Sequence, residues 1–502
     1  MSENSPTGAD APVGLILAGI ETEYGFTLEG RGADDQIEDA IAFVRGYPGP
    51  CFVGWDYCYE SPRADLRGFR LDQLAVDPED AKRDAGRSYG APHDVRSDRI
   101  LPNGARFYND HGHPEYATPE CWSLRELVLH DTAGQFVLLR AARALADATG
   151  KGVSVYKNNT DFHGSSYGTH ENYLVPRSVG FERLFAAVTP MLIARQILCG
   201  AGKVGSESGS RADYQLTARA DFFTEAANAE TLFRRPIFNT RDEPHAPTQT
   251  WIRLHVISGD ANMIPSCTRR KIGLVKLALM LEFAGQAPTW KITQPVRAFQ
   301  ALSRDETRGY KVALDGRNWT TAYEIIESYL AAAEKVLDLD AEFMALISEC
   351  RALLNDLAGA YVLAPRAIDW AAKKLILDAY REESGASWRD PLLQAYDLEY
   401  HNIDPADGLY SALESMGQVD AMPALDERLA RLDGAPERGR AFARGLAVAR
   451  FPNNLTRACW RSLTFLIEGE ETEVELPPDR TYPVQLEAAG DVGTFIQILR
   501  NA

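Results

Sequence analysis

Acidic, imidazole and guanidinium side chains gather in one short stretch, Arg106 to Glu115 (RFYNDHGHPE). Within it Arg106, Tyr108 and Asp110 alternate, so a strand would place all three on one face. Such a density of hard oxygen donors favours Mg²⁺, which shares its ligand shell with substrate phosphates, and the neighbouring Arg suggests a nucleotide. We therefore predict a carboxylate-lined magnesium and nucleotide site here.

Two further strand-like segments carry polar side chains at the same spacing. Glu21 and Glu23 follow the apolar run Val13 to Ile20, and His255 alternates with Arg253 in the segment WIRLHVI. Either pattern has an ordinary explanation, because a solvated strand face often carries two carboxylates and a lone strand histidine is usually a core residue. The polar segment from Tyr156 to Tyr173, by contrast, has a composition that core packing does not use.

The common ATP-binding signatures are absent from the chain. There is no GxxxxGK[ST] motif and no kinase HRD or DFG set, and Gly200 to Lys203 (GAGK) is too short for a P-loop, so we interpret it as a turn. The sequence therefore offers no known phosphate-binding loop for the predicted nucleotide.

The elements that position these residues mix strands and helices irregularly, which predicts an α+β fold. The predicted strands are Val13–Ile20, Phe52–Tyr59, Arg106–Asp110, Val153–Tyr156 and Trp251–Ile257. The predicted helices are Ser123–Thr149, Phe181–Cys199 and Cys267–Phe283, followed by a mainly helical region from Asn318 to Arg381.

Composition also divides the chain. Residues 1–14 are polar and small and predict a disordered tail, and residues 62–101, rich in Asp and Arg, predict a mobile loop insertion. The polar stretch Asp433–Arg440 (DGAPERGR) is the best candidate for a boundary. We expect a catalytic domain over residues 15–432 and a small C-terminal domain over residues 433–502.

Bulk properties exclude several classes of protein. A formal net charge of −18 argues against a nucleic-acid partner, which would need clustered Lys and Arg. No apolar stretch is long enough to cross a membrane, and the start of the chain lacks the features of a signal peptide. The 7 cysteines are scattered and never form a CxxC pair, which indicates reduced thiols. We expect a cytoplasmic protein.

Several long strings resemble one known family, that of the Pup ligase and the Pup deamidase/depupylase. They are GIETEYG (19–25), NGARFYNDHGHPEYATPEC (103–121), YKNNTD (156–161), SYGTHENYL (166–174), FNTRDEPHA (238–246) and RLHVISGDANM (253–263). The resemblance covers nearly the whole chain. It implies a glutamine-synthetase-like curved antiparallel sheet that holds ATP and Mg²⁺, a small C-terminal domain, and a Pup-like modifier protein and its conjugates as partners.

The resemblance also assigns roles to individual residues. It implies magnesium positions at Glu21, Tyr108 and Glu115, a further metal ligand at His255, nucleotide contacts at Arg106, Thr118 and Trp460, and a catalytic aspartate at Asp110. Arg219 and Arg241 are expected to anchor the C-terminal residue of the modifier, mainly because of their charge.

The family contains enzymes of opposite direction. In the ligase the modifier's terminal glutamate is joined to a substrate lysine, and Asp110 would take the proton of the lysine amine. In the depupylase an amide or isopeptide bond is cleaved, and Asp110 would activate water or attack the bond directly. GIETEYG, HPEYAT and CGAGKV resemble the ligase, whereas the segment 54–69 and the insertion 62–101 resemble the depupylase. We give the insertion more weight and predict a deamidase/depupylase, with the ligase as the alternative.

Three other interpretations remain open. The sequence of the insertion matches neither enzyme well, so the chain could be a divergent branch with another tag or with nucleotide turnover alone. A binding module without catalysis would have no use for the joint presence of Glu21, Tyr108, Asp110 and Glu115. An enzyme resembling glutamate-cysteine ligase would use the same metal chemistry, but it predicts turnover with free amino acids.

Overall fold

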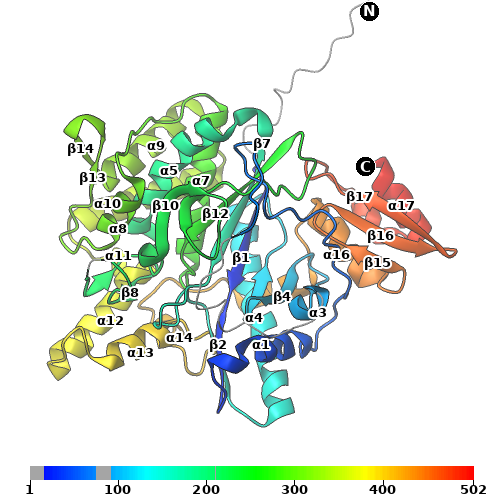
Figure 1. Ribbon diagram of the computed structural model, residues 1–502, viewed down its shortest axis with the longest axis horizontal. Coiled ribbons are helices and arrows are strands. Elements are labelled where there is room, and N and C mark those ends of the chain that lie inside the picture. The colour runs from blue at the N-terminus through cyan, green and yellow to red at the C-terminus, as the bar shows by residue number, and fades with distance from the viewer. Residues whose placement is uncertain (1–15, 75–91, 210) are drawn as a thin grey trace, which may run out of the picture.

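The computed structural model describes residues 16–74, 92–209 and 211–502, so the predicted tail 1–14 lies outside the described residues. At its centre is a six-stranded sheet in the order β12-β7-β1-β5-β4-β3, in which every neighbouring pair is antiparallel (Figure 1). Its strands are β1 (Ala18–Glu23), β3 (Arg99–Ile100), β4 (Arg106–Asp110), β5 (His113–Ala117), β7 (Thr169–Pro176) and β12 (Trp251–Gly259).

The two faces of this sheet differ in chemistry because side chains alternate along each strand. On one face Ile20, Phe107, Tyr116 and Leu254 are buried in the main hydrophobic core. Helices α4 (Leu124–Thr149), α5 (Phe181–Ala194) and α7 (Pro265–Phe283) contribute to the same core. The opposite face carries the polar residues that the sequence singles out.

Local sequence explains where the longest of these helices begins and ends. The Ser123 side chain accepts a hydrogen bond from the backbone N–H of Glu126 and so caps the first turn of α4. At its other end Gly150 takes the left-handed conformation, with φ 68°, that ends a helix at little cost.

Shorter strands pair around the central sheet. They are β2 (Gly25–Leu28) with β6 (Val153–Tyr156), β8 (Lys203–Val204) with β9 (Tyr214–Gln215), β10 (Phe223–Asn228) with β11 (Arg235–Asn239), and β13 (Lys311–Ala313) with β14 (Trp319–Thr321). Among the described residues before residue 434, the remaining α-helices are α1 (Gln36–Arg45), α3 (Pro92–Arg96), α6 (Gln196–Cys199), α8 (Pro295–Ser303), α9 (Ala322–Val336), α10 (Ala341–Ala358), α11 (Ala364–Ala367), α12 (Asp369–Ser384), α13 (Pro391–Tyr400), α14 (Leu409–Ser415) and α15 (Leu425–Asp433).

The C-terminal residues form a small three-stranded sheet with two helices, drawn in orange and red at one side of Figure 1. The elements are α16 (Arg440–Arg450), β15 (Leu455–Ala458), β16 (Ser462–Ile467), β17 (Glu470–Glu475) and α17 (Val492–Asn501). They build a second hydrophobic cluster that also takes in Phe52, Trp55 and Tyr108. The boundary predicted at Asp433–Arg440 falls between α15 and α16, and the division into two domains stays a prediction.

The predicted strand Phe52–Tyr59 is wrong. This segment makes only isolated bridges, from Phe52 to Ile100 and from Trp55 to Ala458. Gly54 has φ 156°, and the segment has no continuous partner strand, so no regular ladder forms. The aromatic side chains of the segment nevertheless pack in the second hydrophobic cluster. The region Asn318–Arg381 is mainly helical as predicted, but it begins with strand β14.

The predicted loop 62–101 is shorter than the sequence suggests, because both of its ends are packed. Asp65 is buried and accepts a hydrogen bond of 2.6 Å from the Thr240 hydroxyl, and residues 92–100 form α3 and β3. Residues 75–91 lie outside the described residues, so the predicted mobility of the centre stays untested. Among the helices of the described residues, none has the length and apolar character that crossing a bilayer requires.

Candidate active site

One face of the central sheet collects charged and imidazole side chains from five strands. The register places Glu23 of β1 opposite Glu115 of β5, and Glu115 opposite Tyr108 of β4. It also places Glu21 opposite His170 of β7. Segments separated by up to 234 residues in the chain, from Glu21 to His255, therefore meet on one surface, and the predicted site residues of β1, β4, β5 and β12 lie together.

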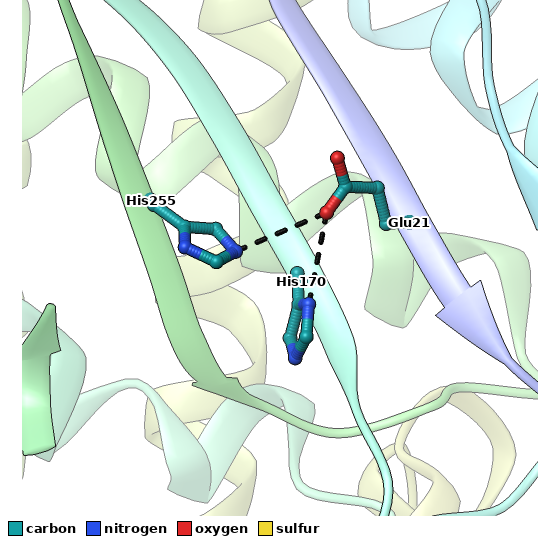
Figure 2. Close-up of side chains that lie close together, drawn as sticks. All are labelled: Glu21, His170 and His255. Carbon is teal, nitrogen blue, oxygen red and sulfur yellow. Dashed lines mark ion pairs between the residues drawn. The ribbon is translucent and has the colours of Figure 1, made fainter. Parts of the chain in front are cut away.

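A first group consists of Glu21, His170 and His255, whose donor atoms lie within 4.8 Å of one another. Figure 2 shows both imidazoles beside the Glu21 carboxylate, with His170 Nδ1 at 3.6 Å and His255 Nε2 at 3.8 Å from the same oxygen. The two rings stand nearly perpendicular, with centroids 5.0 Å apart. Each residue comes from a different strand, so the rigid sheet fixes the group.

The protonation states in this group suit a cation. Burial and the neighbouring Arg253 cation lower the pKa of His255 well below its ordinary value, so the ring is neutral and offers a lone pair. Neither ring nitrogen of His255 has a hydrogen-bond partner among the described residues. Burial would raise the pKa of Glu21, but the hydrogen bond from His170 and the Arg253 charge outweigh it and lower that pKa. Glu21 is therefore ionised.

A second group, Glu23, Asp110 and Glu115, is made of carboxylates alone, again with donor atoms within 4.8 Å of one another. Burial, followed by the charges of Asp110 and Glu23, raises the pKa of Glu115 well above its ordinary value. Its Oε2 atom has no hydrogen-bond partner within the described parts of the chain. Buried carboxylates this close repel one another unless a proton or a cation lies between them, so the group is suited to a divalent ion.

Asp110 differs from the other carboxylates because it has a cationic partner. Arg96 Nη1 lies 2.9 Å from Asp110 Oδ1. Burial would raise the pKa of Asp110, but the Arg96 guanidinium and nearby imidazoles outweigh it and lower the pKa to about 2. Asp110 is thus ionised at neutral pH, the state required of a base or a nucleophile.

An open cavity adjoins the first group on the same face of the sheet. Its lining includes Gly19, Glu21, Thr118, Arg253 and Trp460, so two of the predicted nucleotide contacts share one cavity with a predicted metal ligand. Thr118 Oγ1 accepts a hydrogen bond of 3.0 Å from the Ile20 backbone N–H and keeps its own hydroxyl proton for donation.

Arg106, the third predicted nucleotide contact, lies between two aromatic rings. Its guanidinium carbon is 4.0 Å from the ring centroid of Trp55 and 4.0 Å from that of Tyr108. Its Nη2 atom pairs with Asp98 at 2.6 Å. Trp55 also meets Trp460 edge to face, with centroids 5.1 Å apart, so Arg106 and Trp460 are joined through one ring. The stack holds the Arg106 cation beside the carboxylate groups.

Tyr108 has a clear partner in the structure. A side-chain hydrogen bond links it to Glu115, and burial raises the pKa of its hydroxyl well above the ordinary value. The hydroxyl therefore stays protonated and is suited to orienting Glu115. Its role as a magnesium position remains a prediction.

Neither Arg219 nor Arg241 lines the cavity described above. Arg219 is buried and donates to the Tyr167 carbonyl; burial lowers its pKa to about 9. Arg241 Nη2 donates to the Thr231 hydroxyl at 3.0 Å. Their predicted role as anchors for the modifier stays untested.

Three residues join the site without having been assigned to it. His170 completes the first group, Glu23 belongs to the second, and Arg253 Nη1 lies 3.6 Å from Glu21 Oε1. The alternation of side chains along β1 and β12 indicates that Glu23 shares a face with Glu21, and Arg253 with His255. No signal in the sequence places His170 opposite Glu21, because that depends on which strands pair.

Comparison with known proteins gives related enzymes over most of the chain. The family model described as Pup-ligase protein matches residues 16–464. A depupylase from Acidothermus cellulolyticus is 38% identical over 480 residues, covering 92% of this chain and 93% of the relative. A Pup deamidase/depupylase from Mycobacterium tuberculosis is 35% identical over 471 residues, covering 90% and 92%. A Pup–protein ligase from Actinosynnema mirum is 37% identical over 404 residues, covering 78% and 89%.

Solved structures agree with this. The complex between the prokaryotic ubiquitin-like protein Pup and its ligase PafA matches with a TM-score of 0.77 and 28% identity, covering 97% of this chain and 93% of that one. The ligase PafA in complex with ADP matches with a TM-score of 0.71 and 30% identity, covering 86% and 96%. The predicted α+β fold with a central antiparallel sheet is confirmed. The chain belongs to the Pup-ligase protein family.

Proposed function

We propose that this protein is an ATP- and magnesium-dependent deamidase/depupylase that cleaves the C-terminal amide of a Pup-like modifier or its isopeptide bond to a lysine. The observation that carries the proposal is the ionised carboxylate of Asp110, next to a group of carboxylates and on the same face as the cavity of Thr118 and Trp460. Such a carboxylate can take a proton from water or attack a carbonyl carbon.

The choice of cleavage over ligation is supported by the extent of the similarity. The depupylase and deamidase relatives match 92% and 90% of this chain, whereas the Actinosynnema mirum ligase, at similar identity, matches 78%. The insertion at 62–101, which resembles the depupylase, supports the same choice.

The residues present fit divalent cations in two ways. Glu23, Asp110 and Glu115 provide only oxygen donors, as Mg²⁺ prefers, while Glu21, His170 and His255 provide two imidazoles and one carboxylate, a set that also accepts Mn²⁺ or Zn²⁺. Cations held there would neutralise the charge of bound phosphates. Support for ATP comes from the cavity and from the ADP in the related ligase structure.

In the proposed reaction, water is added across the C–N bond of the amide. In one route Asp110 removes a proton from the water that attacks the carbonyl carbon. In the other route Asp110 attacks the carbonyl carbon itself, and water then hydrolyses the acyl-aspartate that this attack forms. The leaving amine takes up a proton and departs as ammonia or as the lysine side chain. Arg219 and Arg241 are proposed to hold the modifier's C-terminal residue, and Arg106, Thr118 and Trp460 the nucleotide.

The alternative is a Pup–protein ligase. The same carboxylate could take a proton from the attacking lysine amine, and the structural match to the Pup ligase spans 97% of this chain.

We further propose a cytoplasmic location, because all the cysteines, from Cys51 to Cys459, are free thiols.

One experiment separates these functions. The purified protein is incubated with ATP, Mg²⁺ and a Pup-like peptide ending in Gln, and separately with the peptide ending in Glu plus a lysine-bearing protein. Mass spectrometry should show conversion of Gln to Glu, a gain of about one mass unit, in the first reaction only. Conjugate formation in the second reaction without any deamidation would establish the ligase instead, and turnover of free amino acids would establish a small-molecule enzyme.

A further inference from the structure

Helix α3 and the residues that lead from it into strand β3 are fixed against β4 by several independent contacts. Figure 1 places α3 next to β4. Asn109 Nδ2, on β4, donates to the Val95 carbonyl at 3.0 Å. From α1, Arg45 donates to the Asp94 carbonyl at 2.9 Å and to the Ser97 hydroxyl at 3.0 Å. This segment therefore has a defined position relative to the strand that carries Asp110.

Two further features show that this position is imposed by its surroundings. Ser97 has φ 54°, a left-handed conformation that non-glycine residues seldom adopt and that persists where neighbouring contacts require it. The next residue, Asp98, is buried and pairs with Arg106 and with the Tyr57 hydroxyl. The end of the insertion is thus built into the site and does not merely connect to it.

Arg96 is the last residue of α3 and reaches the candidate catalytic carboxylate. Its Nη1 atom lies 2.9 Å from Asp110 Oδ1, and its guanidinium carbon lies 5.6 Å from the ring centroid of Tyr108. The His111 imidazole is farther from Asp110, with its Nε2 atom 3.9 Å away on an exposed side chain. Asp110 is the last residue of β4, so Arg96 is the contact that can fix the orientation of its carboxylate.

We propose that Arg96 is a positioning residue for the reaction: it holds the Asp110 carboxylate in the orientation needed for cleavage and does not itself bind the nucleotide or the modifier. This inference rests on the proposed function. It gives the C-terminal end of the 62–101 insertion a direct part in the chemistry. A displacement of about 1 Å in a reacting group can lower a rate about 100-fold, so the loss of this contact should be visible in kcat.

The test compares wild type, Arg96→Ala and Arg96→Lys with the peptide ending in Gln, ATP and Mg²⁺. We expect Arg96→Ala to lower kcat about 10- to 100-fold, while KM for the peptide and Kd for the nucleotide, measured by calorimetry, change less than about threefold. Arg96→Lys should recover part of kcat, because it retains a cation near Asp110. A kcat within about twofold of wild type in Arg96→Ala, a rise in Kd or KM as large as the fall in kcat, or no recovery in Arg96→Lys would overturn the proposal.

Arg45→Ala is the matched control, because Arg45 holds the same segment without being paired to Asp110. Its kcat should stay within about twofold of wild type; an equal loss would assign the effect to packing of the segment. Crystal structures of wild type and Arg96→Ala give a readout that needs no activity. Asp110 should change its side-chain conformation in the variant, and an unchanged Asp110 overturns the proposal even if the protein proves not to cleave amides.

Discussion

Replacement of Asp110 by Asn is the most direct test of the chemistry, because it removes the charge and the proton-accepting capacity while keeping the shape. With a pKa of about 2, Asp110 is essentially fully ionised at pH 7, so all of the enzyme is in the active protonation state. The amide oxygen of Asn can still accept the hydrogen bond from Arg96. The substitution thus isolates proton transfer or nucleophilic attack from positioning.

The expected loss is a factor of about 10² to 10⁴ in kcat, the usual contribution of a general base. At about 1.36 kcal/mol per tenfold change, the barrier would rise by about 3 to 5 kcal/mol. Nucleotide affinity should change by less than about threefold, since the cavity is lined by other residues such as Thr118 and Trp460.

The assay is single-turnover deamidation of the peptide ending in Gln, followed by mass spectrometry, with nucleotide affinity measured on the same sample. Asp94→Asn, which alters an exposed carboxylate on α3, serves as the control and should keep full activity. If Asp110→Asn keeps more than about a tenth of the wild-type rate, Asp110 is not the catalytic residue and the proposed mechanism is refuted.

Other consequences follow from the carboxylate groups and from the packed ends of the insertion. Glu115 has a raised pKa and takes up a proton on folding, so the metal-free protein loses stability as pH rises through that pKa. Glu115→Gln should therefore raise the Tm of the metal-free protein at pH 7.5 by about 1 to 4 °C in a thermal scan. Mg²⁺ should make this increase in Tm smaller. Glu21→Ala should weaken nucleotide binding in calorimetry when Mg²⁺ is present and have little effect without it; equal affinities would move the metal site. His255→Ala should lower Mn²⁺ affinity about tenfold or more, read from the EPR signal of free Mn²⁺. Deleting Leu71–Val95 should lower Tm, because it removes the carbonyl that accepts from Asn109; an unchanged Tm would contradict the packing described here.

The alternation of side chains along a single strand can be predicted from the sequence, and it indicates which residues share a face. It placed Arg106, Tyr108 and Asp110 on one face, and the structure has them on one face of β4. The long helices were also predictable, because apolar residues recur at helical spacing and Ser123 provides a cap. These features depend only on residues close together in the chain.

The pairing of strands could not be derived in the same way. His170 reaches Glu21 only because β7 lies beside β1 in one register, and a shift by one residue would move it to the opposite face. The segment Phe52–Tyr59 differs from its predicted strand for a related reason. Its apolar residues form only isolated bridges, and two of its aromatic rings, Trp55 and Tyr57, lie against the Arg106 guanidinium. Long-range contacts, and not local preference, decide both cases.

The geometry of the carboxylate face also explains why the direction of the reaction is difficult to infer from the site. An ionised Asp110 can take a proton from a lysine amine as readily as from water, and the carboxylates around it hold phosphate-bound cations for either reaction. What distinguishes ligation from cleavage must therefore lie in the groups that decide which molecule reaches Asp110 and how its carboxylate is held. Arg96, contributed by the end of the insertion, is such a group, and it lies in the part of the chain that favoured the depupylase interpretation. The C-terminal end of the insertion is therefore best understood as part of the catalytic apparatus, and the effect of replacing Arg96 should be sought in kcat before it is sought in stability.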